Sequence, residues 1–148
     1  EMGLQVGVGR THMYYQGTPE FAFGYGLSYS KWLLEWTDHE HKLDLALWDT
    51  GPPIKVEVRV ANTGPLEGSQ TVLFFWRPIS HRKAINQKLI GFQGTRRLEV
   101  GQEEVLTFQI QPTDFALWSD TRNATVVSSG TYQLEARASD VQVNRTLQ

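Results

Sequence analysis

The chain has 148 residues, 14 of them lysine or arginine and 16 aspartate or glutamate, so its net charge is −2. This length favours one domain, and 40% apolar with 20% charged residues is typical of a globular protein. The near-neutral charge excludes the basic signature of nucleic-acid binding, and the lack of cysteine excludes disulfides, thiolate catalysis and cysteine-ligated zinc. The longest apolar run, residues 72–76, is far shorter than the ~20 residues of a membrane span. We therefore expect neither nucleic acid nor membrane as a partner.

The ends of the sequence and two sequons bear on where the protein is made. The sequence begins at Glu1 rather than at a methionine, and its first thirty residues hold no apolar signal-peptide core. Asn123 and Asn144 each begin an Asn-x-Thr glycosylation sequon. We interpret the chain as a fragment of a longer precursor that carries a secretion signal. The expected location is secreted or extracellular, with vacuolar or lysosomal as the variant.

Residues 10–29 differ from the rest of the chain because they combine glycines with aromatic side chains and follow neither a strand nor a helix period. The aromatic residues are Tyr14, Tyr15, Phe21, Phe23, Tyr25 and Tyr29. Such rings carry large apolar area that must be buried against something. We predict that residues 1–29 form a linker arm, called the arm below, which straps onto a neighbouring domain or an external partner. An extension folded on its own domain explains the pattern equally well.

The rest of the chain has the pattern of short β-strands. In residues 54–60 isoleucine and valine alternate with charged residues, which predicts a strand with one buried face. Residues 71–76 are apolar on both faces, as in a central strand or a strand covered by another domain. Further strands are predicted at 88–92, up to Leu98, at 106–110, at 131–137 and at 141–147, with one helical turn at 114–118 capped by Asp114.

Seven or eight short strands, close turn signals and almost no helical periodicity are typical of an antiparallel β-sandwich. We predict an all-β sandwich of the immunoglobulin or fibronectin type III kind over residues 30–148. A closed barrel is the alternative, but the uneven loop lengths favour the sandwich.

A search for catalytic patterns finds none. The acidic candidates for two-carboxylate chemistry are Asp38, Glu40, Asp44, Asp49, Glu57, Glu103 and Glu104, and nothing in their spacing pairs them across a cleft. Residues 38–41 (Asp-His-Glu-His) could offer two imidazoles to a metal ion, with His12 or His81 as a third ligand, but a solvated connection is the simpler interpretation. There is no nucleophile elbow or phosphate loop. We predict no catalytic, metal or cofactor-binding residue.

Two tryptophans are possible binding residues. Trp32 and Trp36 lie four residues apart, so a regular strand places both on one side, with Leu34 between them. If exposed, they would stack on sugar rings. If buried, they would fill the core or an interdomain contact, which the neighbouring leucine favours.

Several segments resemble glycoside hydrolase family 3 enzymes. Residues 10–19 (RTHMYYQGTP) and 23–29 (FGYGLSY) are similar to the segment that joins the catalytic part of these enzymes to their C-terminal fibronectin type III-like domain. The likeness continues, in order, through the strands and turns at 60–64, 68, 88–92, 100–103, 108–117 and 130–132.

The resemblance implies an accessory domain of a secreted exo-acting β-xylosidase or β-glucosidase. In that family the nucleophile lies on a β/α barrel and the acid/base on an α/β-sandwich domain, and the chain contains neither, so it is expected to be inert by itself. Residues 73–75 with Pro78, the loop that contains His81, and residues 141–147 resemble the β-xylosidase branch. The implied role is to brace these two catalytic domains as partners. The docking candidates are Arg10, Tyr14, Tyr15, Phe21, Phe23, Tyr25 and Tyr29.

Two other functions stay open at this point. One is a polysaccharide- or lignin-binding module that uses Trp32 and Trp36. The other is a freestanding structural or adhesion protein, because a sandwich fold alone does not define a function.

Overall fold

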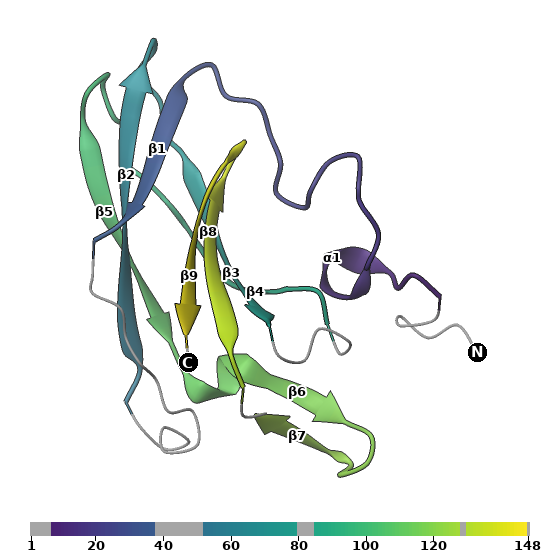
Figure 1. The fold of residues 1–148 in the computed structure, drawn as a ribbon. Coiled ribbons are helices and arrows are strands. Elements are labelled where there is room, and N and C mark those ends of the chain that lie inside the picture. The colour runs from purple at the N-terminus through teal and green to yellow at the C-terminus, as the bar shows by residue number, and fades with distance from the viewer. Residues whose placement is uncertain (1–6, 38–51, 80–84, 128–129, 148) are drawn as a thin grey trace.

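The computed structural model describes residues 7–37, 52–79, 85–127 and 130–147, and within them two antiparallel sheets pack face to face (Figure 1). The first sheet has the order β1-β2-β5, with β1 at Lys31–Trp36, β2 at Ile54–Gly64 and β5 at Glu103–Ile110. The second has the order β4-β3-β8-β9, with β4 at Lys88–Gly94, β3 at Thr71–Pro78, β8 at Tyr132–Ala138 and β9 at Val141–Leu147. The predicted all-β sandwich is confirmed.

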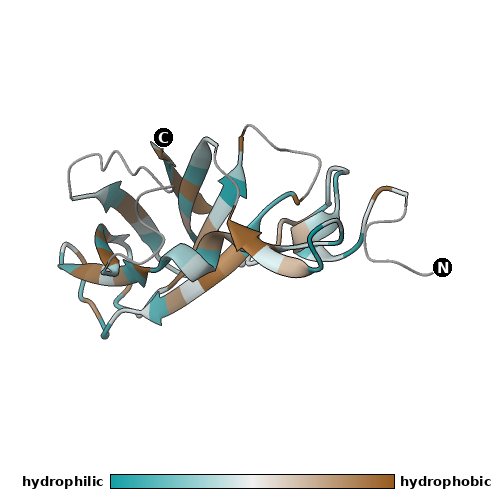
Figure 2. Ribbon diagram, turned by 90° about the horizontal axis from the view of Figure 1, so that it is seen from below, coloured by the Kyte–Doolittle hydropathy of each residue, from teal (hydrophilic) through white to brown (hydrophobic). Residues whose placement is uncertain are grey.

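The core lies between the two sheets and follows the predicted alternation. On β2, Val56, Val58 and Val60 are buried, while the charged residues between them face outward. Phe74 of β3 stacks on Phe108 of β5 with ring centroids 4.7 Å apart, which joins the two sheets. Figure 2 shows the same alternation as brown and teal segments along the strands. Burial of this apolar face is the main driving force for the fold.

The outer face of the second sheet is also partly buried. Phe75 follows Phe74 across an irregularity in the β3–β4 register, and both are 1% exposed. The arm covers Phe75, because the rings of His12 and Phe23 lie against it. The apolar character of β3 on both faces, read from the sequence, therefore has its cause within the chain.

Two local predictions are wrong. The strand expected up to Leu98 is an isolated bridge, in which the backbones of Gly68 and Leu98 exchange two hydrogen bonds. In place of one helical turn at 114–118, a 3-10 helix (η1, Pro112–Phe115) leads into β6 (Ala116–Ser119). The N-cap residue is Gln111 and not Asp114, which is the third residue of the 3-10 helix. Oδ2 of Asp114 accepts a hydrogen bond from the backbone N–H of Gln111.

The strand β6 pairs with β7 (Ala124–Val127) in a hairpin that the sequence analysis missed, and Figure 1 shows it projecting from the end of the sandwich. None of the helices in the described residues is long and apolar enough to cross a membrane.

The described part of the arm, residues 7–29, contains one short helix, α1 (Thr11–Tyr14), and otherwise lacks regular structure. Figure 1 shows it on the side of the second sheet that faces away from the first sheet. The molecule thus has three layers: the first sheet, the second sheet and the arm.

Candidate docking surface

The arm is anchored on the second sheet by two stacked rings. The imidazole of His12 lies on the phenyl ring of Phe23, with centroids 4.1 Å apart. Both rings meet Phe75 edge-on, at 6.3 and 6.2 Å. Offset and edge-to-face contacts are the favoured geometries of aromatic pairs. Two separate parts of the arm therefore converge on one strand of the sandwich.

Hydrogen bonds reinforce this contact. The backbone N–H of Asn86 donates to the carbonyl of Met13 at 2.6 Å, and Nη1 of Arg137 donates to the carbonyl of Phe23 at 2.7 Å. The side chains of Met13 and Tyr14 also pack against the core. Of the two arrangements that the sequence left open, the structure thus shows the arm folded on its own domain.

A buried ion cluster lies beneath the arm. Glu135 of β8 is 1% exposed, and its carboxylate accepts hydrogen bonds from Arg137 Nε at 2.7 Å and from Nη2 of Arg77. Arg137 also lies over the ring of Phe75, 5.0 Å from its centroid. A buried carboxylate is costly unless charged donors surround it, and the two guanidinium groups meet that need.

The position of His12 has an electrostatic consequence. Burial against the sheet disfavours the charged imidazolium, and the positive charge of Arg137 adds to the effect, so the pKa of His12 is lowered from its ordinary value of 6.5. The lowered pKa favours the neutral imidazole in the stack on Phe23.

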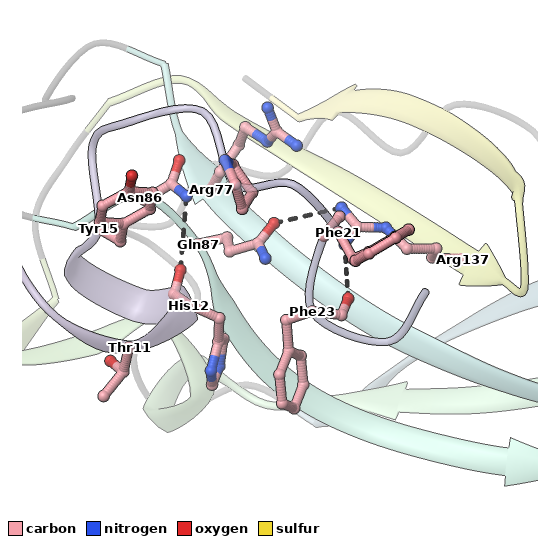
Figure 3. Close-up of a pocket in the computed structure, with 11 residues that line it drawn as sticks. Thr11, His12, Tyr15, Phe21, Phe23, Arg77, Asn86, Gln87 and Arg137 are labelled. Carbon is pink, nitrogen blue, oxygen red and sulfur yellow. Dashed lines mark hydrogen bonds between the residues drawn. The ribbon is translucent and has the colours of Figure 1, made fainter. Parts of the chain in front are cut away.

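A pocket of about 460 Å³ opens between the arm and the second sheet (Figure 3). The arm supplies aromatic walls from Tyr15, Phe21 and Phe23, and the sandwich supplies polar groups. Gln87 accepts a hydrogen bond from Arg137 within it, at 3.4 Å, and Asn86 donates to the carbonyl of His12 at 3.4 Å.

The predicted docking residues divide into two groups. Phe23 is an anchor through its contacts with His12 and Phe75, although its ring is still 46% exposed, and Tyr14 and Tyr15 are half-buried. Arg10 and three rings remain exposed: Phe21 by 65%, Tyr25 by 43% and Tyr29 by 91%. Phe21 and Tyr25 lie 5.1 Å apart and form one exposed aromatic pair. Phe21 and Tyr25 therefore give the arm an exposed aromatic face.

Neither candidate sugar-stacking tryptophan forms an open platform. Trp32 is 6% exposed, and its indole N–H donates to Ser28 Oγ at 2.9 Å. The guanidinium of Arg145 lies 4.7 Å over the half-buried ring of Trp36, and Phe74 meets that ring edge-on. These positions agree with the interpretation that the two tryptophans fill the core. The alternative that they form an exposed row for sugar stacking is wrong.

The described acidic candidates are not grouped for catalysis. Glu103 pairs with Arg59, and Glu104 accepts a hydrogen bond from the backbone of Arg96. Residues 38–49 and His81 lie outside the described residues. The hypotheses on the Asp-His-Glu-His segment and on the carboxylates near it therefore stay predictions. In the described part of the chain, no group of three acidic, histidine or cysteine side chains could hold a metal ion.

Sequence reasoning missed the ion cluster, although its residues lie on strands that it predicted. The alternation on β8 places Glu135 and Arg137 on the outward face, where charged residues are normally solvated. Only the position of the arm changes that expectation. The available signal was the chemistry of β3, because an outward Phe75 on a neighbouring strand already indicated a cover.

Several known proteins are similar to this chain. Residues 70–140 match the family model described as a fibronectin type III-like domain. The chain is 29% identical to the probable β-glucosidase D of Aspergillus niger, over 87% of this chain and 19% of that protein. It is also 29% identical to the xylan 1,4-β-xylosidase of Xylanibacter ruminicola, over 85% of this chain and 14% of that protein. The match thus spans less than a fifth of each of these two relatives.

Two solved structures extend the likeness. The β-glucosidase of Listeria innocua superposes with a TM-score of 0.73 at 21% identity, covering 87% of this chain and 17% of that one. The GH3 β-glucosidase of Bifidobacterium adolescentis gives a TM-score of 0.65 at 26% identity, covering 84% and 18%. A fibronectin type III-like match that spans so small a share of each protein is consistent with a non-catalytic part of a glycoside hydrolase. Residues 70–140 therefore match a fibronectin type III-like domain, and the chain as a whole is similar to one part of β-glucosidases and β-xylosidases that include a GH3 enzyme.

Proposed function

We propose that the chain is the C-terminal accessory domain of a secreted family 3 hydrolase that removes terminal glucose or xylose units, and that it stabilises the catalytic domains of that enzyme. The longer protein is called the parent polypeptide below. The relatives include both β-glucosidases and β-xylosidases, so either sugar suits the comparisons.

One observation carries the bracing role: the arm is anchored on one side and exposes rings on the other. His12 and Phe23 hold it to the sandwich, while Phe21, Tyr25 and Tyr29 keep much of their ring surface exposed. At about 25 cal/mol per Å², covering even two or three such rings contributes several kcal/mol before the costs of association. An aromatic face on a rigid support suits a permanent interdomain contact.

The test uses substitutions that spare the anchors. Replacing Phe21, Tyr25 and Tyr29 with serine should lower the Tm of the parent polypeptide but leave the Tm of the 148-residue chain nearly unchanged, because these rings contribute little to the sandwich itself. The control is Trp118→Ser, which removes an exposed ring from the distant β6–β7 hairpin. An unchanged Tm and activity of the triple variant in the parent polypeptide would rule out the bracing role.

Secretion is part of the proposal, and the two sequons support it. Asn123 is exposed in the β6–β7 turn with φ of 47°, a conformation that asparagine tolerates better than most residues, and Asn144 is exposed on the edge strand β9. Both side chains are thus accessible to glycosylation. Treatment of the native protein with an N-glycosidase should lower its mass, and Asn123→Gln with Asn144→Gln should abolish that change. An unaltered native mass would contradict the glycosylation.

Polysaccharide binding is the second candidate function, and Trp118 is the residue that favours it. Its ring is 61% exposed on the projecting hairpin, and Asp120 Oδ1 fixes its orientation by accepting the indole N–H at 3.0 Å. An oriented, exposed indole offers a flat apolar face to a sugar ring. Retention of the chain on insoluble xylan or cellulose, lost on Trp118→Ala, would support this function, and no retention of the natural chain would dismiss it.

A further inference from the structure

The pocket between the arm and the second sheet, called the arm pocket below, carries an unbalanced charge. Its lining contains Arg77 and Arg137 and, among the described residues, no aspartate or glutamate. One carboxylate, that of Glu135, lies behind the lining and pairs with both arginines. The lowered pKa of His12 favours the neutral imidazole, so this residue adds no positive charge to the pocket. Two guanidinium groups thus share one negative charge.

The two arginines differ in what they can still bind. Arg137 uses Nε on Glu135, Nη1 on the carbonyl of Phe23, and Nη2 on Gln87 and Glu135. Arg77 donates from Nη2 to Glu135, and within the described residues it has no second hydrogen-bond partner. A guanidinium group carries five N–H donors, so most of those on Arg77 have no partner among the described residues. Its side chain is 34% exposed and lines the pocket, as Figure 3 shows.

The charge and the aromatic lining of the arm pocket indicate which kind of group would bind there. A guanidinium fork binds a carboxylate through two parallel hydrogen bonds, and it does so most strongly where water is excluded. The rings of Tyr15, Phe21 and Phe23 line the same pocket and add apolar surface to it. Because Phe21 also pairs with the exposed Tyr25, the pocket is continuous with the aromatic face of the arm. An acidic side chain on an otherwise apolar protein segment fits both features.

We propose that the arm pocket receives an aspartate or glutamate side chain from the catalytic part of the parent polypeptide, with its carboxylate on Arg77. This inference rests on the proposed function and names the chemistry of that contact. The acidic side chain neutralises the second guanidinium, and the surrounding segment covers Phe21.

A photo-crosslinking experiment identifies the occupant. A benzophenone amino acid replaces Phe21 in the parent polypeptide, and the crosslinked peptides are sequenced by mass spectrometry. The expected partner is a peptide from the catalytic part with an aspartate or glutamate beside the crosslinked position. The same probe at Trp118 is the control and should not give that peptide. Crosslinks only to residues of this chain, or to a catalytic peptide without an acidic residue, would overturn the inference.

A thermal comparison tests the role of Arg77 itself. Arg77→Gln removes the Glu135 contact in both the 148-residue chain and the parent polypeptide, but only the parent loses a second carboxylate. We expect the drop in Tm to be larger in the parent by several degrees, because only there does the substitution remove a second charged hydrogen bond. Arg59→Gln is the matched control, because Arg59 pairs with Glu35 and Glu103 on the opposite sheet. Equal drops in the two proteins would contradict the carboxylate contact.

The crosslinked acidic residue allows a final check. Its substitution by glutamine or asparagine should lower the Tm of the parent with natural Arg77 but have little further effect in the Arg77→Gln background. Additive effects would overturn the pairing. If the aromatic triple variant lowers the Tm of the parent while Arg77→Gln shows no excess, the bracing function stands and this inference fails.

Discussion

The outer faces of the two sheets carry similar arginine–glutamate pairs in opposite surroundings. On the first sheet, the side chains of Arg59 and Glu35 are 40% and 44% exposed, and solvent screens their ion pair. On the second sheet, Arg137 and Glu135 are 8% and 1% exposed because the arm covers them. We therefore expect the loss of an arginine–glutamate pair to lower the stability of the chain little on the first sheet and much more on the second. The two pairs differ because the arm covers only the one on the second sheet.

The largest expected effect comes from the covered pair. Glu135→Gln removes the charge but keeps the shape, and it leaves two arginines without their shared counter-ion. We expect the free energy of unfolding of the 148-residue chain to fall by about 3 kcal/mol, the usual cost of breaking a buried pair, with a drop in Tm of about 10 °C. Thermal unfolding followed by circular dichroism measures it. A drop no larger than that of Glu35→Gln would show that the arm does not exclude water from the cluster.

A smaller loss is expected from the aromatic anchor. Phe23→Ala removes the stack on His12 and the edge contact with Phe75, although the ring is itself 46% exposed. The free energy of unfolding should fall by about 1–2 kcal/mol, the range of an aromatic contact with partial burial. Cleavage within residues 16–25 by a nonspecific protease should also become faster. Unchanged proteolysis would mean that the hydrogen bonds alone hold the arm.

Acidification should weaken the same anchor. The pKa of His12 is lower in the folded chain than its ordinary 6.5, so the unfolded state binds the proton more readily. The stability contributed by the neutral ring is therefore complete above pH 6.5 and is lost as the pH falls through the folded pKa. His12→Phe keeps a ring at this position without the titration, so the Tm difference between the natural chain and this variant should change across that interval. A constant difference from pH 7.5 to 5 would contradict the account.

The smallest effect is expected on the exposed face. Arg59→Gln breaks the ion pairs with Glu35 and Glu103, yet both partners are well solvated. The Tm should change far less than for Glu135→Gln, and the small change should shrink further in 0.5 M salt, since salt screens exposed charges. A salt-insensitive loss as large as that of Glu135→Gln would remove the distinction between the two faces.

Much of the sandwich was predictable because its strands alternate. Residues 54–60 and 131–137 show one apolar and one polar face, and the structure places the apolar residues in the core. The β6–β7 hairpin was not predictable in this way, because its short strands are only partly buried and leave a weak pattern. Leu98 is fully buried, but a single bridge rather than a strand holds it.

The candidate docking surface was predictable only in part. Aromatic composition identified the arm, but it could not distinguish the anchor Phe23 from the exposed Phe21, which lies two residues away. That distinction depends on which ring reaches Phe75. For the same reason, Glu135 and Arg137 look like solvated residues of an outward strand face until the arm is placed over them. Long-range contacts of this kind leave no local pattern.

Hydroxyl-radical footprinting shows whether the exposed rings of the arm are covered in the parent polypeptide. The labelling rates of Phe21, Tyr25 and Tyr29 are measured in the 148-residue chain and in the parent, with Trp118 as the internal reference. We expect strong protection of these three rings in the parent and equal labelling of Trp118 in both proteins. Equal labelling of all four rings in the two proteins would contradict it.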